Sequence, residues 1–86
     1  MAHYEKTLQK VLSGVSDKNI RFVDLCQMLR DLGFEERIRG SHHIFRRAGI
    51  QEKINLQKDG DKAKPYQVRQ VRHIILTHHL GEQANG

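Results

Sequence analysis

The sequence has few of the residues that mark secreted and membrane proteins. Cys26 is the one cysteine among 86 residues, so no disulfide can form within the chain, which is typical of a reducing compartment. No apolar run approaches the roughly 20 residues that span a bilayer, and the N-terminus lacks the hydrophobic core of a signal peptide. We therefore expect a cytoplasmic protein that does not bind a membrane.

Internal repeats and low-complexity segments are also absent, and the length allows one domain with a modest core. Acidic residues are in deficit: ten Asp and Glu stand against fifteen Lys and Arg, which gives a formal net charge of +5. An excess of basic residues in a small domain favours an anionic partner, with nucleic acid as the leading candidate. A basic surface that serves only solubility is the alternative that composition leaves open.

The first part of the chain predicts two helices. Apolar residues within 1–13 recur at i, i+4, i+7 and i+8, so we expect a short amphipathic helix there, followed by a connection over residues 14–19. The clearest helix is expected over residues 22–32, and Gly33 can end it in a left-handed conformation without steric cost. Cys26 lies on the apolar stripe of this helix, and we interpret it as a core residue rather than a nucleophile.

The middle of the chain predicts a sheet. Short strand-like runs separated by glycine-containing turns indicate three strands, Glu35–Arg39, His42–Arg47 and Gln51–Gln57. In the second strand, Ile44 and Phe45 cannot both face the core without a bulge. If Phe45 faces inward, His43 shares its side and His42 faces the open side, which is the arrangement we expect. A polar loop is expected over residues 58–64.

A last helix is expected to begin at Pro65, which suits the first helical position, and to end at Leu80–Gly81, leaving a flexible tail over residues 82–86. These elements predict an α+β domain in which helices cover one face of a three-stranded antiparallel sheet. The main domain, residues 20–81, then has the order α-β-β-β-α. An extra helix and linker precede it in residues 1–19.

Two adjacent histidines at the start of the second strand form the centre of the candidate site. His42 and His43 follow a Gly-Ser dipeptide, and histidine is the side chain that most readily exchanges protons near neutral pH. Arg37 and Arg39 stand just before the pair, and Arg46 stands just after it. A proton-exchanging group among cations is expected where a phosphodiester is bound and attacked. The alternative is a pair of half-exposed strand residues without chemistry.

A metal site is not expected. His42 and His43 point to opposite sides of a strand, and the later histidines are not spaced to share a helix face. The chain also lacks the cysteines of a structural zinc site, the carboxylate cluster of a two-magnesium nuclease and a complete calcium loop. A nuclease with this sequence would work without metal. A base would take the proton of the ribose 2′-hydroxyl, which attacks the phosphate, and an acid would protonate the leaving 5′-oxygen.

The sequence resembles the HicA toxin family over roughly Arg21 to Leu80. The likeness rests on Leu32-Gly33-Phe34, then Gly40-Ser41-His42-His43-Ile44-Phe45, then a strand and a late basic helix. The resemblance implies a fold like that of the double-stranded-RNA-binding domain and the activity of a bacterial mRNA interferase. Such a protein is an endoribonuclease toxin that needs no cofactor and is neutralised by a HicB-like antitoxin.

The resemblance assigns the catalytic position to the histidine directly after Gly-Ser, which is His42, with Ser41 in a supporting role. His43 is the alternative catalytic residue, and the choice between a base and an acid stays open. Many family members carry a proline-histidine pair near the end of the third strand. This chain has Leu56-Gln57 there, so it lacks that second histidine.

Several basic residues are candidates for phosphate contacts, each with a solvated surface charge as the alternative: Arg37, Arg39, Arg46, Lys53, Lys62, Lys64, Arg69 and Arg72. Two further functions stay open. One is a non-catalytic RNA-binding module of the same fold, which RNA cleavage in the presence of a chelator would distinguish from the enzyme. The other is a protein-interaction domain, which would show no salt-dependent affinity for RNA.

Overall fold

The structure, a computed structural model, describes residues 4–83 and has an α+β order, as predicted. Along the chain the elements are α1 (Tyr4–Ser13), the 3-10 helix η1 (Asp17–Asn19), α2 (Phe22–Asp31), β1 (Glu35–Arg39), β2 (His42–Arg47), β3 (Ile50–Asp59), β4 (Lys62–Ala63), α3 (Pro65–Thr77) and α4 (Leu80–Gln83). No helix within this range is both long and apolar enough to cross a membrane.

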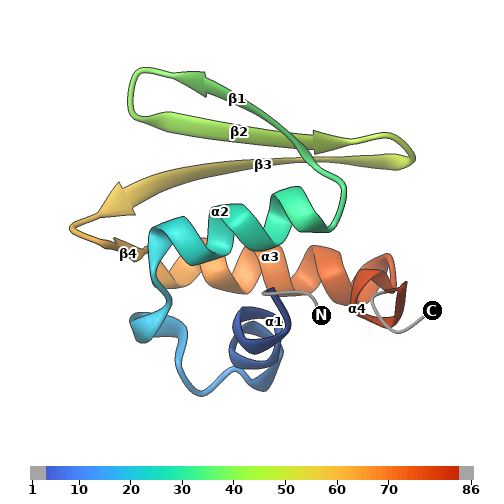
Figure 1. Cartoon of the computed structure of the whole chain (residues 1–86), viewed down its shortest axis with the longest axis horizontal. Coiled ribbons are helices and arrows are strands. Elements are labelled where there is room, and N and C mark those ends of the chain that lie inside the picture. Colours follow the sequence, from blue (N-terminus) through green and yellow to red (C-terminus); the bar gives the residue numbers. More distant parts are fainter. Residues whose placement is uncertain (1–3, 84–86) are drawn as a thin grey trace.

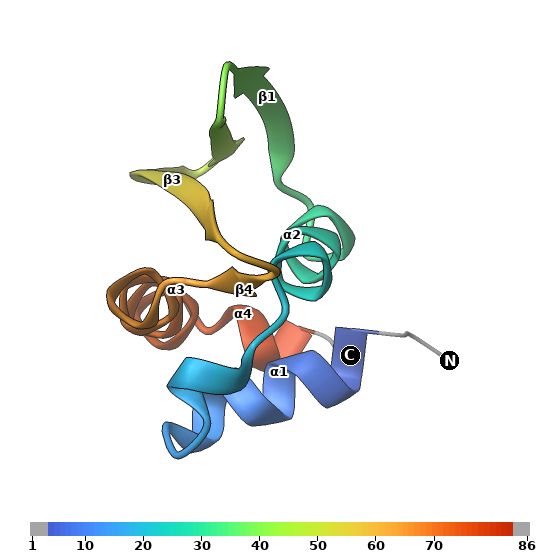
Figure 2. The same cartoon turned by 90° about the vertical axis from the view of Figure 1, so that its left-hand side faces the viewer.

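The sheet is antiparallel with the order β1-β2-β3-β4, so the prediction of three strands was wrong by one short strand. Figures 1 and 2 show α2 and α3 on one face of the sheet, and α1 in a further layer beneath these two helices. Within residues 4–83 no helix covers the opposite face of β1, β2 and β3 (Figure 1). The core therefore lies between the sheet and the helices, and one sheet face stays open.

Gly33 ends α2 in the way that the sequence predicts. Its φ is 96°, a left-handed conformation that favours glycine. The N–H of Gly33 donates to the carbonyl of Arg30 and the N–H of Phe34 donates to that of Leu29, both at 3.0 Å, which is a Schellman motif. The chain thereby turns back into β1 with Phe34 buried. The apolar stripe predicted for α2 is buried as well: Phe22, Leu25, Cys26, Leu29 and Leu32.

The register of β2 decides which of the two histidines faces the helices. Phe45 is fully buried and pairs with Ile54, while Ile44 occupies the opposite face. A bulge between Phe45 and Arg47 lets pairing resume at Ile50. The predicted orientation of this strand is thus confirmed, with its first histidine outward and its second inward.

The additional strand, β4, lies where a polar loop was predicted. β3 continues to Asp59, and a tight turn at Gly60, whose φ is 64°, brings β4 back onto its end. Ala63 is buried, and its N–H donates to the carbonyl of Ile20 at 2.8 Å. The short strand thus depends on a backbone partner far earlier in the chain, which a local sequence pattern does not reveal.

The predicted N-terminal helix is present as α1 and packs through Leu8 and Val11, which are both buried. Leu12, which belongs to the same predicted stripe, is 37% exposed because this short helix buries only a narrow line of side chains. Arg72 of α3 fastens the helix: its guanidinium donates to the carbonyl of Val11 at 3.0 Å and pairs with Asp17 at 2.9 Å.

The C-terminal helix begins at Pro65 as predicted but ends at Thr77, and the chain turns at His79, whose φ is 56°, into α4. Leu80, at the start of α4, is buried, so the helix expected to stop there restarts instead. Residues 84–86 of the predicted tail lie outside the described residues. The apolar residues that recur at helical spacing along α3 are buried: Val68, Val71, Ile74 and Ile75.

Candidate active site

The two adjacent histidines face opposite sides of the sheet. His43 points toward α2, where its ring meets the ring of Phe22 edge-on with the centroids 4.8 Å apart. His42 is exposed on the open face. Successive side chains of a strand leave from opposite faces, so neighbours in sequence are separated in space. The pair therefore provides one accessible imidazole and one that is partly enclosed.

The imidazole of His42 is held by a side chain of the neighbouring strand. Its Nδ1 lies 3.1 Å from Oδ1 of Asn55 on β3. In the sheet register His42 stands between Arg39 of β1 and Gln57 of β3, and Asn55 is its diagonal neighbour. An oriented imidazole thus stands beside an arginine on a solvent-accessible surface.

Ser41 is bound to β3 rather than to either histidine ring. Gln57 Nε2 donates to Ser41 Oγ at 3.1 Å, and Lys64 Nζ donates to Gln57 Oε1 at 3.4 Å. The backbone N–H of Gln57 donates to Oε1 of the buried Gln67 at 3.2 Å. These bonds join the turn before His42 to the end of β3 and the start of α3. The supporting role of Ser41 stays a prediction, with this network as its setting.

A hollow on the open face gathers half of the predicted phosphate contacts. It is lined by Glu35, Glu36, Arg37, Arg39, Ile44, Arg46 and Lys53. Four of these residues are cationic, and Arg39 is also the cross-strand neighbour of His42. A polyanion that lies in this hollow would therefore pass several cations before it reaches the imidazole.

The remaining predicted contacts lie outside the hollow. Lys64 bonds to Gln57, and Lys62 stands 3.8 Å from Asp61. Arg69 is exposed on α3, in the layer of helices. The Arg72 side chain is 19% exposed and is engaged in fastening α1, so we leave Arg72 out of the proposed RNA contacts.

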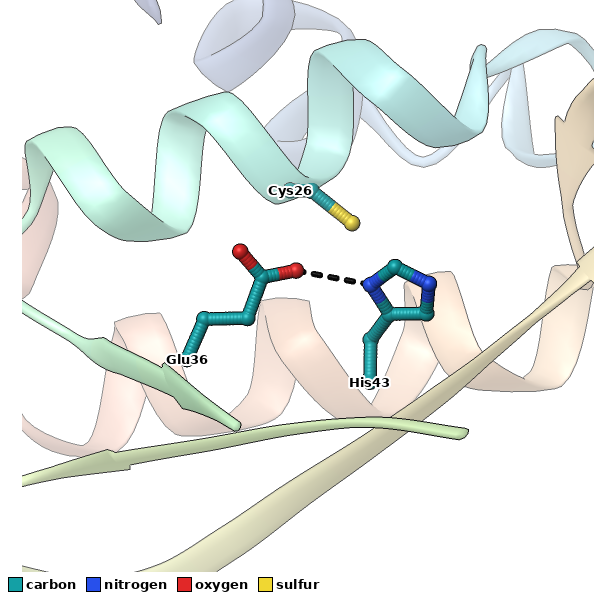
Figure 3. A group of neighbouring side chains, drawn as sticks. All are labelled: Cys26, Glu36 and His43. Atoms are coloured by element: carbon teal, nitrogen blue, oxygen red, sulfur yellow. Dashed lines mark hydrogen bonds and ion pairs between the residues drawn. The ribbon is translucent and has the colours of Figure 1, made fainter. Parts of the chain in front are cut away.

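His43 belongs to a charged cluster beneath α2 (Figure 3). Its Nδ1 lies 2.7 Å from Oε2 of Glu36, and Arg30 pairs with the other carboxylate oxygen. The side chains of His43 and Glu36 are 22% and 13% exposed. Burial opposes ionisation of Glu36, but hydrogen bonds from His43 and Arg30 outweigh it and hold the pKa of this carboxyl below its ordinary value. The cluster thus connects β1 and β2 to α2.

Cys26 adds a third metal-binding atom type to this cluster. A sulfur, a carboxylate oxygen and a ring nitrogen from Cys26, Glu36 and His43 lie within 4.8 Å of one another, a donor set that zinc accepts (Figure 3). Burial, and then the charge of Glu36, raise the pKa of the thiol to about 12. A divalent cation would have to replace the hydrogen bond between His43 and Glu36 and deprotonate this thiol, so the geometry and the raised pKa favour a hydrogen-bonded cluster.

Sequence reasoning did not single out Glu36 and Asn55, the residues that hold the two histidines. A signal for Glu36 is present, because strand alternation places it on the same face as Ile38, and a carboxylate at an inward position needs a partner. The role of Asn55 depends on the pairing of β2 with β3. That register is a property of the folded sheet, and the sequence does not fix it locally.

The fold and the site together define a small α+β domain whose open sheet face is basic and carries an exposed histidine. A family model described as "HicA toxin of bacterial toxin-antitoxin" matches residues 23–81, well over half of the chain. The chain therefore belongs to the HicA toxin family, which confirms the resemblance found in its motifs. No curated protein and no solved structure matches the chain significantly. The matched range leaves out α1.

Proposed function

We propose that this chain is the toxin of a toxin-antitoxin pair and acts in the cytoplasm as a metal-independent endoribonuclease on mRNA. The observation that carries the proposal is the position of His42: an oriented, exposed imidazole on the open sheet face, beside a cation-lined hollow. Membership of the HicA toxin family supports the toxin role. The alternative, an RNA-binding module without catalysis, fits the basic surface equally well and is separated by the experiment below.

The proposed reaction needs one proton acceptor, one proton donor and cations. The base takes the proton from the ribose 2′-hydroxyl, and this oxygen attacks the adjacent phosphorus. The bond from phosphorus to the 5′-oxygen breaks, and an acid supplies the proton of the new 5′-hydroxyl. The products are a 2′,3′-cyclic phosphate and a 5′-hydroxyl end. Cationic side chains such as Arg39 stabilise the charge that develops on the phosphate oxygens.

His42 suits this reaction better than its neighbour does. A substrate phosphate can reach the open face of the sheet, whereas the ring of His43 lies between the sheet and α2, against Phe22 and Glu36. An imidazole bound to a half-buried carboxylate and packed on a phenyl ring contributes to stability. We therefore propose His42 as the catalytic residue, and the experiment below tests whether His43 takes this role instead.

The partner that neutralises the toxin is proposed to be a HicB-like antitoxin that covers the same face. Exposed cations at Arg37, Arg39 and Arg46 favour acidic groups on such a partner. Ile44 lines the hollow and adds an apolar contact. Complementary charge would speed the encounter, and the apolar contact would slow dissociation.

The test is cleavage of a labelled mRNA transcript by the purified chain in the presence of EDTA. We expect cleavage by the parent protein, a loss of roughly 10²- to 10⁴-fold in His42→Ala, and an unchanged circular dichroism spectrum. The matched control is His73→Ala, which removes an exposed histidine from α3. Binding without cleavage by the parent would establish the RNA-binding module instead. Full activity in His42→Ala, with loss in a folded His43→Ala, would transfer the catalytic role to the neighbour.

A further inference from the structure

We infer that Asn55 fixes the tautomer of His42 and thereby makes Nε2 the atom that accepts the proton, so that His42 acts as the general base. The inference rests on the proposed ribonuclease function and deepens it. It assigns a positioning role to a residue outside the Gly-Ser-His-His motif. It also predicts the base role for His42, a choice that the sequence leaves open and that the pH profile below tests.

The first argument is the geometry of the hydrogen bond. Nδ1 of His42 lies 3.1 Å from the side-chain oxygen Oδ1 of Asn55. A carbonyl oxygen only accepts hydrogen bonds, so the shared proton belongs to Nδ1. In the neutral imidazole the other nitrogen, Nε2, then carries the lone pair. The hydrogen-bond partner of Nδ1 thus determines whether Nε2 can accept a proton.

The second argument is the position of Asn55 in the sheet. Asn55 pairs with Ile44 across β2 and β3, while Gln57 pairs with His42. Asn55 therefore reaches the ring diagonally within the open face. Gln57 is occupied by Ser41 and Lys64. The direct cross-strand neighbour is thus already bound elsewhere, and the diagonal amide holds the imidazole.

The third argument is the charge around the ring. Arg39 faces His42 from β1, and Lys64 approaches from the segment before α3 through its bond to Gln57. On β3, Asp59 stands two residues after Gln57 on the same face, as Asn55 stands two residues before it, and Lys53 lies further along the strand. On β1, Arg37 and then Glu35 lie beyond Arg39 on this face. The amide on Nδ1 adds no charge of its own among these groups, and its oxygen leaves Nε2 as the ring atom with a free lone pair.

The neighbouring histidine provides an internal comparison. Nδ1 of His43 is also bound by an oxygen, but that oxygen belongs to the carboxylate of Glu36. A carboxylate brings a negative charge to the ring that it holds, whereas an amide orients the ring without adding charge. The two histidines therefore differ in their partners: an amide holds His42 on the open face, and a carboxylate holds His43 beneath α2.

The first test is the tautomer itself, observed by nitrogen-15 NMR of the histidine side chains without any substrate. We expect the neutral ring of His42 to carry its proton on Nδ1 in the parent protein and mainly on Nε2 in Asn55→Leu. The matched control is Gln51→Leu, which removes an exposed amide from the same strand and should leave the tautomer unchanged. A parent protein with the proton on Nε2, or an unchanged tautomer in Asn55→Leu, would overturn the inference.

The second test is the pH profile of mRNA cleavage. Asn55→Leu should lower kcat by on the order of tenfold with little change in KM, since general base catalysis depends on the tautomer while binding does not. Asn55→Asp should recover activity, because a carboxylate also accepts from Nδ1. The negative charge of the new carboxylate keeps the ring of His42 doubly protonated up to a higher pH, so the acid limb of the pH profile should move to higher pH.

The outcomes of the two tests separate this inference from the proposed function. If the parent protein cleaves no RNA, the proposed function fails, and the NMR experiment alone still decides whether Asn55 sets the tautomer. If the alkaline limb moves in Asn55→Asp instead of the acid limb, His42 acts as the acid and the inference is wrong. Cleavage by Asn55→Leu at the parent rate would also refute it.

Discussion

At the scale of single residues, different environments separate His42, the proposed catalytic residue, from His43, which we expect to contribute to stability. His42 contacts the side-chain amide of Asn55 on the exposed sheet face, and His43 contacts the carboxylate of Glu36 beneath α2. Arg30 shares the contact with this carboxylate, so Glu36 has the guanidinium of Arg30 on one oxygen and the imidazole of His43 on the other. A change at the carboxylate of Glu36 should therefore alter the stability of the folded state and leave the outward side chains of β1 in place.

Glu36→Gln should lower the free energy of unfolding by about 1–3 kcal/mol at pH 7, because Arg30 and His43 lose a charged acceptor. The pKa of Glu36 is lower in the folded protein than in the unfolded chain. The stabilisation is therefore present above the unfolded value and disappears as the pH falls through the folded value. The difference between parent and variant, measured by urea denaturation, should shrink between roughly pH 5 and pH 3.

The control for this prediction is Glu35→Gln, which changes the neighbouring, exposed carboxylate on the other face of β1. Its effect should stay within about 0.5 kcal/mol at every pH, as is usual for an exposed surface group. If the difference in the free energy of unfolding between the parent and Glu36→Gln stayed constant from neutral to acidic pH, the ionised carboxylate would not be the source of the stabilisation.

At the scale of elements, local patterns predicted those parts of the fold that local physics determines. The stripe of α2, its end at Gly33 and the start of α3 at Pro65 depend on spacing, a left-handed residue and a fixed φ. β4 was missed because two residues have no periodicity and are held by a distant carbonyl at Ile20. The partner of His42 was missed for the same reason, since only the folded register brings Asn55 to it.

Arg72 was expected to contact RNA because it lies on the basic edge of the last helix, whereas its guanidinium connects α3 to α1 and η1. Arg72→Met should lower the free energy of unfolding by about 1–3 kcal/mol, because Asp17 would keep a largely buried, unpaired charge. It should leave the salt dependence of RNA affinity unchanged. Thermal denaturation and RNA titrations at several salt concentrations measure the two effects.

The matched control is Arg69→Met on the exposed side of the same helix, which should leave the melting temperature within error of the parent value. If Arg72→Met instead reduced the salt dependence and left stability intact, Arg72 would belong to the RNA site after all.

At the scale of the whole molecule, the sheet separates a face packed against the helices from an open face that we propose binds RNA and the antitoxin. Inward side chains pack on α2 and α3, whereas the outward cations are not part of the buried core. Substitutions on the open face should therefore change affinity and activity while stability stays the same. This separation makes the electrostatic predictions testable with folded variants.

RNA affinity should fall steeply with salt, because each phosphate contact releases condensed counterions. Arg39→Gln and Lys53→Gln should each reduce the slope of log affinity against log salt by about 0.7 to 1. Fluorescence anisotropy of a labelled RNA over a salt series measures the slope. Lys6→Gln, on the exposed side of α1, is the control and should leave the slope unchanged. A slope near zero for the parent protein would contradict the electrostatic account.

Antitoxin and RNA should compete, since both are proposed to use the open face. In the complex with its antitoxin, the chain should lose RNA affinity, and the amides of residues 41–44 should become protected from hydrogen exchange. Competition titrations and exchange mass spectrometry measure these effects. A ternary complex that retains full RNA affinity would place the antitoxin at a remote surface.

The position of α3 near the C-terminal end of the described chain has a consequence for biosynthesis. The inner face of the sheet needs the buried stripe of α3, and α1 is fastened by Arg72 of the same helix. A nascent chain on the ribosome therefore already contains both histidines before it contains the helix that the sheet packs against. Because domains fold as units once their core is complete, translation products that stop before Pro65 should remain unfolded and harmless. On the proposed function, RNA cleavage should therefore begin only after α3 has emerged from the ribosome.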